Sequence, residues 1–208
     1  MKKEIKPTRT ELIGIRRRIT LYERGYKLLK MKRDGLVLEF FNILSKARNI
    51  RSQIIKDYSV AEEKLNIARS VDGEAAVTSA SFSIRQDPTV KMGSKNVMGV
   101  VVPTKLESGT VKRRIDQRGY GIVGMSVRIN EATAAYEQLV EDIILAAELE
   151  TTLKRLLTEI EKNKRTVNAL EFRLLPELHQ TAASIEARLE EMERENVFRL
   201  KRIKSSIT

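Results

Sequence analysis

Apolar residues recur at alternating three- and four-residue steps along the first third of the chain. The stripe consists of Leu12, Ile15, Ile19, Tyr22, Tyr26, Leu29, Leu36, Phe40, Ile43, Ala47, Ile50, Ile54, Tyr58, Ala61, Leu65 and Ala68. A mean spacing of 3.5 residues keeps one seam of a helix turned toward a partner helix, which is the period of a coiled coil. The pattern predicts one helix from about Thr8 to Ser70, about 95 Å long at 1.5 Å per residue.

The start of this helix carries its own signal. Thr8 and Glu11 have the spacing of a capping box, in which the threonine hydroxyl and the glutamate carboxylate satisfy exposed backbone amides. A second apolar stripe runs from about Met125 to Ile203, with several shifts of phase. Pro176 lies inside it and cannot donate a hydrogen bond to the carbonyl of Phe172, so we expect a kink there.

The middle of the chain has a different composition. Residues 72–124 contain seven of the ten glycines. Val77–Ile84 and Val97–Val102 are short β-prone runs, and Asp87-Pro88 and Ser108-Gly109 have the residues of turns. About fifty residues with few aromatics cannot bury much by themselves. We therefore predict a small β-hairpin or loop insert.

These patterns predict a mainly α protein, a long antiparallel two-helix coiled coil with a small β-containing insert at the hairpin end. Its parts are an N-terminal coiled-coil helix (1–70), the insert (71–124) and a C-terminal coiled-coil helix (125–208), which together form one elongated unit. A parallel homodimer of the first helix is the main structural alternative.

Charge is distributed unevenly along the chain. The net charge is +11; 18 basic and 8 acidic residues give residues 1–70 a charge of +10, while 13 basic and 15 acidic residues give residues 125–208 a charge of −2. The two helices are therefore complementary. A basic first helix also fits nucleic acid or an acidic protein surface, so a basic coiled-coil adaptor for either partner is an alternative function.

Several classes of site are excluded by composition. The chain has no cysteine and one histidine, His179, so disulfides, thiolate metal sites and multi-histidine metal sites are ruled out. No run of about 18 apolar residues exists. We expect no metal, no cofactor and no direct membrane insertion.

Two local motifs suggest chemistry. Gly119–Gly124 matches the dinucleotide-binding pattern G-x-G-x-x-G, but the charged run Lys112–Arg118 precedes it where a buried strand is required. We interpret it as a flexible lead into the last helix. The carboxylates of Glu190–Glu195 point around a helix rather than at one centre, which favours a solvated face. No catalytic residues are predicted, and we expect the chain not to be an enzyme.

Three stretches are more specific than a generic coiled coil. They are Pro7–Arg9 with Leu28–Leu36, Arg165–Glu171 followed by Pro176, and Leu189–Glu195 followed by Phe198–Lys204. In this order the chain resembles the D subunits of the archaeal-type and vacuolar-type rotary ATPases, over nearly its whole length. The resemblance implies a non-catalytic rotor shaft that transmits torque for ATP synthesis or for proton or sodium transport driven by ATP hydrolysis.

The resemblance also implies partners. Both chain ends would enter a head of alternating A and B subunits, and the middle of the chain would lie near the small F subunit and a funnel-shaped subunit on the membrane rotor ring. The complex would lie on the cytoplasmic face of the membrane, and no nucleic-acid partner is implied. An antiparallel fold would bring Arg16–Arg18 near Arg199–Lys204, which would make the inserted tip basic on both helices. The predicted partner interface comprises Arg9, Arg16, Arg17, Arg18, Phe198, Arg199, Lys201 and Arg202.

Overall fold

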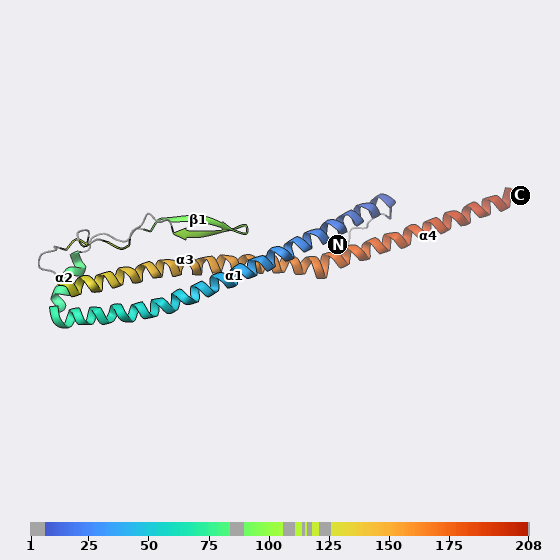
Figure 1. Ribbon diagram of the computed structural model, residues 1–208. Coiled ribbons are helices and arrows are strands. Elements are labelled where there is room, and N and C mark those ends of the chain that lie inside the picture. The colour runs from blue at the N-terminus through green and yellow to red at the C-terminus, as the bar shows by residue number, and fades with distance from the viewer. Residues whose placement is uncertain are drawn as a thin grey trace. The chain divides into compact units, whose positions relative to one another are not determined.

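The computed structural model describes residues 7–83, 90–105, 111–113, 115, 118–120 and 126–207. This part of the chain is mainly helical with one small antiparallel hairpin, which confirms the predicted fold class (Figure 1). The elements in chain order are α1 (Arg9–Asp72), α2 (Glu74–Ser83), β1 (Met92–Val97), β2 (Val100–Lys105), α3 (Val127–Ala169), the π-helix η2 (Leu170–Leu174) and α4 (Leu175–Ile207). Among the described residues, no helix combines the length and the apolar composition needed to cross a membrane.

The chain divides into two compact units. The first comprises Met1–Gly35 and Ile160–Thr208, and the second comprises Leu36–Glu159. The 64-residue helix α1 contributes its first part to one unit and the rest to the other. Each unit pairs a part of α1 with a helix from the second half of the chain.

The first unit is held together by the seam that the stripe predicted. Ile15 and Ile19 of α1 pack with Ala182 and Ile185 of α4, and all four are buried. The half-buried residues that flank this cluster are Leu12, Leu178 and Leu189. Seam residues buried in this way are removed from water at about 25 cal/mol per Å² of apolar surface, and they are the main stabilising contribution of a two-helix unit.

Both ends of α1 follow from local chemistry. The Thr8 hydroxyl accepts a hydrogen bond from the Glu11 amide at 3.3 Å, as the N-terminal half of the predicted capping box requires. At the other end, Gly73 adopts a left-handed conformation with φ of +86° and donates its amide to the Arg69 carbonyl at 3.2 Å. This is a glycine C-cap, which ends the helix and turns the chain into α2.

The core of the second unit lies where α1 ends and α3 begins. One buried cluster joins Ala68 of α1, Ala80 of α2 and Ile129 of α3 with Tyr120, which precedes α3. Here the β-strand expected at Val77–Ile84 was wrong, because residues up to Ser83 are helical. Alanines favour the helix, and packing of Ala80 against Ala68 adds a tertiary contact that propensity alone does not register.

The hairpin also differs from the prediction. The run Val97–Val102 was expected as one strand, but the turn lies inside it, at Met98 and Gly99. Both have positive φ, 51° and 86°, as a type I′ turn requires. The Asn96 side-chain oxygen stabilises the turn by accepting a hydrogen bond of 2.8 Å from the Gly99 amide. The turns predicted at Asp87-Pro88 and Ser108-Gly109 lie outside the described residues.

The helix type changes just before Pro176. The Leu175 amide donates to the Leu170 carbonyl, five residues back, so Leu170–Leu174 form a π-turn and α4 continues from Leu175. A proline removes one amide from the regular pattern, and a wide turn with one extra residue accommodates that loss. The sequence therefore located the irregularity, and the structure identifies it as a π-turn.

Candidate functional site

Two ion pairs and one histidine–carboxylate contact cross from α1 to α4 at intervals of seven residues on each helix. They are Arg9 with Glu193, Arg16 with Glu186 at 2.6 Å, and Glu23 with His179 at 3.7 Å. We call this set the ion-pair ladder. As residue numbers rise by seven on α1, they fall by seven on α4, which establishes the antiparallel register of the first unit. All six positions flank the apolar seam, where charged residues of coiled coils select partner and orientation.

The ladder corrects one expectation about the predicted interface. Arg16 lies opposite Glu186, and Arg199 is thirteen residues farther along α4, about 20 Å at 1.5 Å per residue. The predicted proximity of Arg16–Arg18 to Arg199–Lys204 is therefore wrong. The carboxylates that pair with Arg9 and Arg16 are Glu193 and Glu186, which precede Arg199 in α4. These pairs set the alignment of the two helices.

The predicted basic residues of α1 have two different surroundings. Arg9 and Arg16 contact α4 carboxylates through the ladder. Arg17 and Arg18 are exposed and lie between the buried Ile15 and Ile19 in sequence. Only Arg17 and Arg18 remain as exposed basic residues of this group without a described contact to α4.

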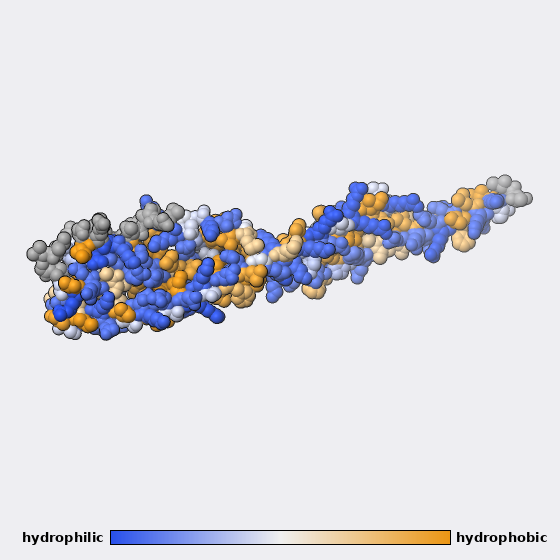
Figure 2. Space-filling model, in the orientation of Figure 1, coloured by the Kyte–Doolittle hydropathy of each residue, from blue (hydrophilic) through white to orange (hydrophobic). Residues whose placement is uncertain are grey.

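The last turns of α4 form a surface of mixed character, which we call the α4 tip and define as Val197–Lys204. Val197, Leu200 and Ile203 recur every three residues, and Phe198 is 72% exposed. The predicted interface residues Arg199, Lys201 and Arg202 are exposed around them. Figure 2 shows apolar residues near the end of α4 with hydrophilic residues beside them. Basic and apolar side chains are therefore presented together, a combination that suits a protein partner.

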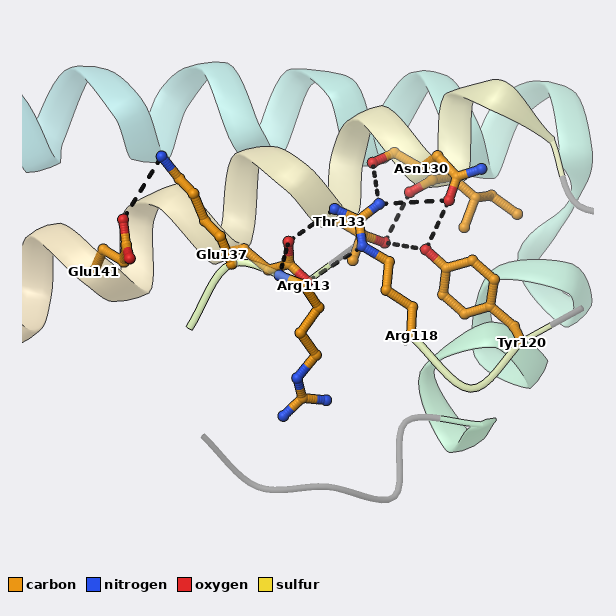
Figure 3. Close-up of polar contacts among 9 residues, drawn as sticks. Arg113, Arg118, Tyr120, Asn130, Thr133, Glu137 and Glu141 are labelled. Atoms are coloured by element: carbon orange, nitrogen blue, oxygen red, sulfur yellow. Dashed lines mark hydrogen bonds and ion pairs between the residues drawn. The ribbon is translucent and has the colours of Figure 1, made fainter. Parts of the chain in front are cut away.

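A second cluster of polar residues fastens the insert to α3. Arg118 is only 6% exposed and donates two hydrogen bonds to Glu137, at 2.7 and 3.2 Å (Figure 3). It also donates to the Asn130 carbonyl at 3.2 Å, and the Tyr120 hydroxyl donates to the Asn130 side chain at 2.8 Å. This bidentate geometry is the strong form of an arginine–carboxylate pair.

Electrostatics keep the Arg118 guanidinium charged despite burial. Burial lowers its pKa, but the hydrogen bonds and the negative charge of Glu137, with a further contribution from Tyr120, outweigh burial and raise the pKa above the ordinary value for arginine. A charge that is buried and fully paired is structural rather than reactive. We conclude that this network holds the insert in place.

The hairpin is attached to the same side of α3 by residues one heptad apart. Glu148 accepts hydrogen bonds from the Thr104 hydroxyl at 2.9 Å and the Lys105 amide at 3.1 Å, and Arg155 donates to the Val101 carbonyl at 2.6 Å. Sequence reasoning did not single out these α3 residues. Carboxylates at Glu137, Glu141 and Glu148, spaced by four and seven residues beside the apolar stripe, were the available signal.

Gly119 has a structural role that accounts for it without a nucleotide. Its φ is +83°, and a Cβ atom built there would lie 2.6 Å from the Ser83 carbonyl oxygen. A glycine is needed for the backbone to pass that close. The motif's other glycines, Gly121 and Gly124, lie outside the described residues.

Comparison with known proteins gives a match along nearly the whole chain. The family of ATP synthase D subunits matches residues 11–205. The A-type ATP synthase D subunit of Methanococcoides burtonii is 56% identical over 204 residues, covering 98% of each chain. That of Methanosarcina mazei is 54% identical over 202 residues, covering 97% of this chain and 96% of the relative. That of Haloquadratum walsbyi is 52% identical over 205 residues, covering 99% of this chain and 88% of the relative.

Proposed function

The chain belongs to the family of ATP synthase D subunits, and from this membership we propose that it is the central rotor shaft of an A-type ATP synthase. In this role it is a non-catalytic part of the complex. It transmits torque between the head, where ATP is made or hydrolysed, and the ion-translocating rotor ring in the membrane. The match over residues 11–205 carries this proposal.

We propose that the first unit enters the head formed by the A and B subunits. The α4 tip and the exposed Arg17 and Arg18 would contact the inner surface of the head. Arg9 and Arg16 act differently, because their ion pairs with Glu193 and Glu186 hold α1 and α4 together. This assignment revises the predicted interface by separating the basic residues that face outward from those used within the chain.

The chemistry of the α4 tip suits a surface that must turn inside its partner. Exposed ion pairs contribute about 0–1 kcal/mol each and are weakened by salt. Arg199, Lys201 and Arg202 can therefore attract an acidic inner surface without fixing one angular position. Phe198 and its apolar neighbours add contact area that is not directional.

We propose the second unit as the binding site for the remaining partners of the shaft. These partners are the small F subunit and the funnel-shaped subunit that joins the shaft to the rotor ring. Support comes from the position of the insert, which Arg118 and Glu148 fasten to α3. In the assembled complex the chain would lie on the cytoplasmic face of the membrane, without inserting into it.

The decisive experiment is a reversible crosslink between shaft and head. The chain has no cysteine, so Lys201→Cys can be paired with a cysteine placed in the facing surface of the head. A disulfide at this point should stop steady-state ATP hydrolysis, because a fixed shaft cannot visit the head sites in sequence. Reduction should restore the rate.

The matched control is Lys201→Cys with no cysteine in the head, treated with the same oxidant. It should keep its full rate of hydrolysis, which separates locking from oxidative damage. Undiminished hydrolysis with the crosslink complete and ion transport still coupled would reject the rotor assignment. A static tether or a nucleic-acid adaptor predicts that result.

A further inference from the structure

The pairing register of the hairpin decides which backbone groups point away from it. Val97 pairs with Val100 across the two-residue turn, so this pair is hydrogen-bonded and the pairs then alternate. Backbone groups of Gly93, Lys95 and Val97 therefore point toward β2. Those of Met92, Ser94 and Asn96 point outward from β1, and those of Val101, Pro103 and Lys105 point outward from β2.

The outer edge of β2 is blocked, because side chains of α3 bond to it at Val101 and Lys105 and the residue between them is a proline. Arg155 donates to the Val101 carbonyl, Pro103 has no amide hydrogen, and Glu148 accepts the Lys105 amide. Side chains of α3 therefore take the place of a neighbouring strand. No further strand can pair along β2 without displacing them.

The outer edge of β1 has no such protection within the described residues. No hydrogen bond from another described residue reaches the outward amides or carbonyls of Met92, Ser94 and Asn96, and all three residues are exposed. Figure 1 shows the hairpin lying beside α3, which the contacts to β2 explain. An edge of this kind is a template for another extended chain.

The side chains around this edge indicate what kind of chain fits it. Residues 90–105 contain lysines at positions 91, 95 and 105 and no acidic residue. Lys105 is near Glu141, whereas Lys91 and Lys95 are exposed. Met92 and Val101 are 53% and 55% exposed and share the outer face of the hairpin. Acidic side chains alternating with apolar ones would match both features.

We propose that β1 accepts an extended acidic segment of another protein of the ATP synthase complex as a third strand of this sheet. The incoming main chain hydrogen-bonds to Met92, Ser94 and Asn96, and its carboxylates face Lys91 and Lys95. This inference rests on the proposed function only in that the strand donor belongs to the same complex. It assigns the hairpin a binding mode based on main-chain hydrogen bonds.

Hydrogen exchange of single amides tests the proposal on the intact complex. In the isolated chain, the outward amides of Met92, Ser94 and Asn96 should exchange quickly, while those of Gly93, Lys95 and Val97 are protected by the hairpin. In the complex, the outward amides should slow by at least about tenfold, as expected for amides that enter strand pairing. Equal exchange in both states would overturn the proposal, and so would outward amides already protected in the isolated chain.

A pair of substitutions at Ser94 gives an independent test. Ser94→Pro removes an outward donor but no hydrogen bond of the hairpin, and Pro103 already occupies the opposite position in the register. Ser94→Ala keeps the amide. With a complex purified without this chain as the probe, Ser94→Pro should weaken binding by about fivefold relative to Ser94→Ala, the effect of one lost hydrogen bond.

The other outcomes are equally informative. Equal binding of the two Ser94 variants would overturn the proposal. If Ser94→Pro unfolds the hairpin, loss of protection at Gly93 and Lys95 reveals it, and the wild-type exchange data then decide. Lys91→Glu with Lys95→Glu should weaken binding most at low salt, and unchanged binding would exclude an acidic donor. Because the crosslink at Lys201 tests the rotor assignment separately, the two proposals can fail independently.

Discussion

Arg16 on α1 and Glu186 on α4 form an ion pair of 2.6 Å, although their side chains are 59% and 49% exposed. The pair lies in the middle of the ion-pair ladder, one heptad from Arg9 and one from Glu23. Its exposure limits its contribution to stability, because water and salt screen it. Its position makes it the best probe of the α1–α4 register.

Reversing the charge of Arg16 should lower the free energy of unfolding slightly, and a compensating substitution at Glu186 should restore it. Arg16→Glu places two carboxylates together and should cost about 1 kcal/mol or less. Adding Glu186→Arg should recover most of that loss, which a double-mutant cycle in denaturant measures.

Arg17→Glu is the matched control at a neighbouring exposed position. It should leave the free energy of unfolding unchanged while weakening assembly with the head, and an equal loss of stability would contradict that assignment.

Removing the buried charge of Arg118 should release the insert from α3. Arg118→Met leaves Glu137, which is 15% exposed, without its main partner, and breaking a buried pair costs about 3–5 kcal/mol. The insert can undock to relieve this cost, so the helices should remain folded. We expect faster proteolysis within residues 106–126 with unchanged far-ultraviolet circular dichroism.

The control for Arg118 is Lys112→Ala. Lys112 is 56% exposed and lies 3.6 Å from Glu141, so its loss should change the cleavage rate little. If both variants are cleaved at the same rate, the buried pair is not what holds the insert.

Two glycines with similar backbone angles should respond differently to alanine. Gly73 and Gly119 have φ of +86° and +83°, so alanine is strained at both, by about 1 kcal/mol. At Gly73 nothing lies within 4 Å of the added methyl group, whereas at Gly119 it would meet the Ser83 carbonyl at 2.6 Å. Gly119→Ala should therefore destabilise more than Gly73→Ala in thermal unfolding. Equal destabilisation would exclude the close approach as the reason for glycine.

Alkaline pH should weaken the second unit through Tyr136. Burial raises the pKa of Tyr136 above its ordinary value of 10, and electrostatic interactions with the neighbouring Tyr58 and Glu62 add to the increase. The unfolded chain therefore releases this proton first, so the free energy of unfolding falls as pH rises above about 10. Well below that pH this group has no effect. Tyr136→Phe should show a shallower decline in denaturant titrations between about pH 9 and 11, and an unchanged slope would rule out Tyr136 as the cause.

The helical part of the fold could be predicted because it depends mainly on the burial of apolar side chains along one seam. Burial of one seam selects residues such as Ile15, Leu36 and Ala61, and all three are buried. Within the first stripe the exception is Tyr58, which is 50% exposed. The insert was harder to predict, because Ala80 and Gly119 have their positions set by contacts with distant residues. Local propensity does not contain those contacts.

The predicted partner surface shows where sequence reasoning reached its limit. It identified the exposed basic residues of α1 and α4, but it assumed that the two helix ends coincide. The register depends on pairing between side chains far apart in sequence, such as Arg16 and Glu186, which are separated by 170 residues. A hydrophobic period of about 3.5 residues repeats at every heptad, so it cannot distinguish one alignment from the next.

The ion-pair ladder removes that ambiguity. If α4 slipped by one heptad in one direction, Glu23 would face Glu186, and only the contact between Arg16 and Glu193 would remain attractive. In the other direction, Arg16 would face His179 and Glu23 would face Phe172. Either slip exchanges two arginine–carboxylate pairs for one. Because the register is fixed, the two helices resist sliding along each other. A twist applied to one helix is therefore transmitted to its neighbour.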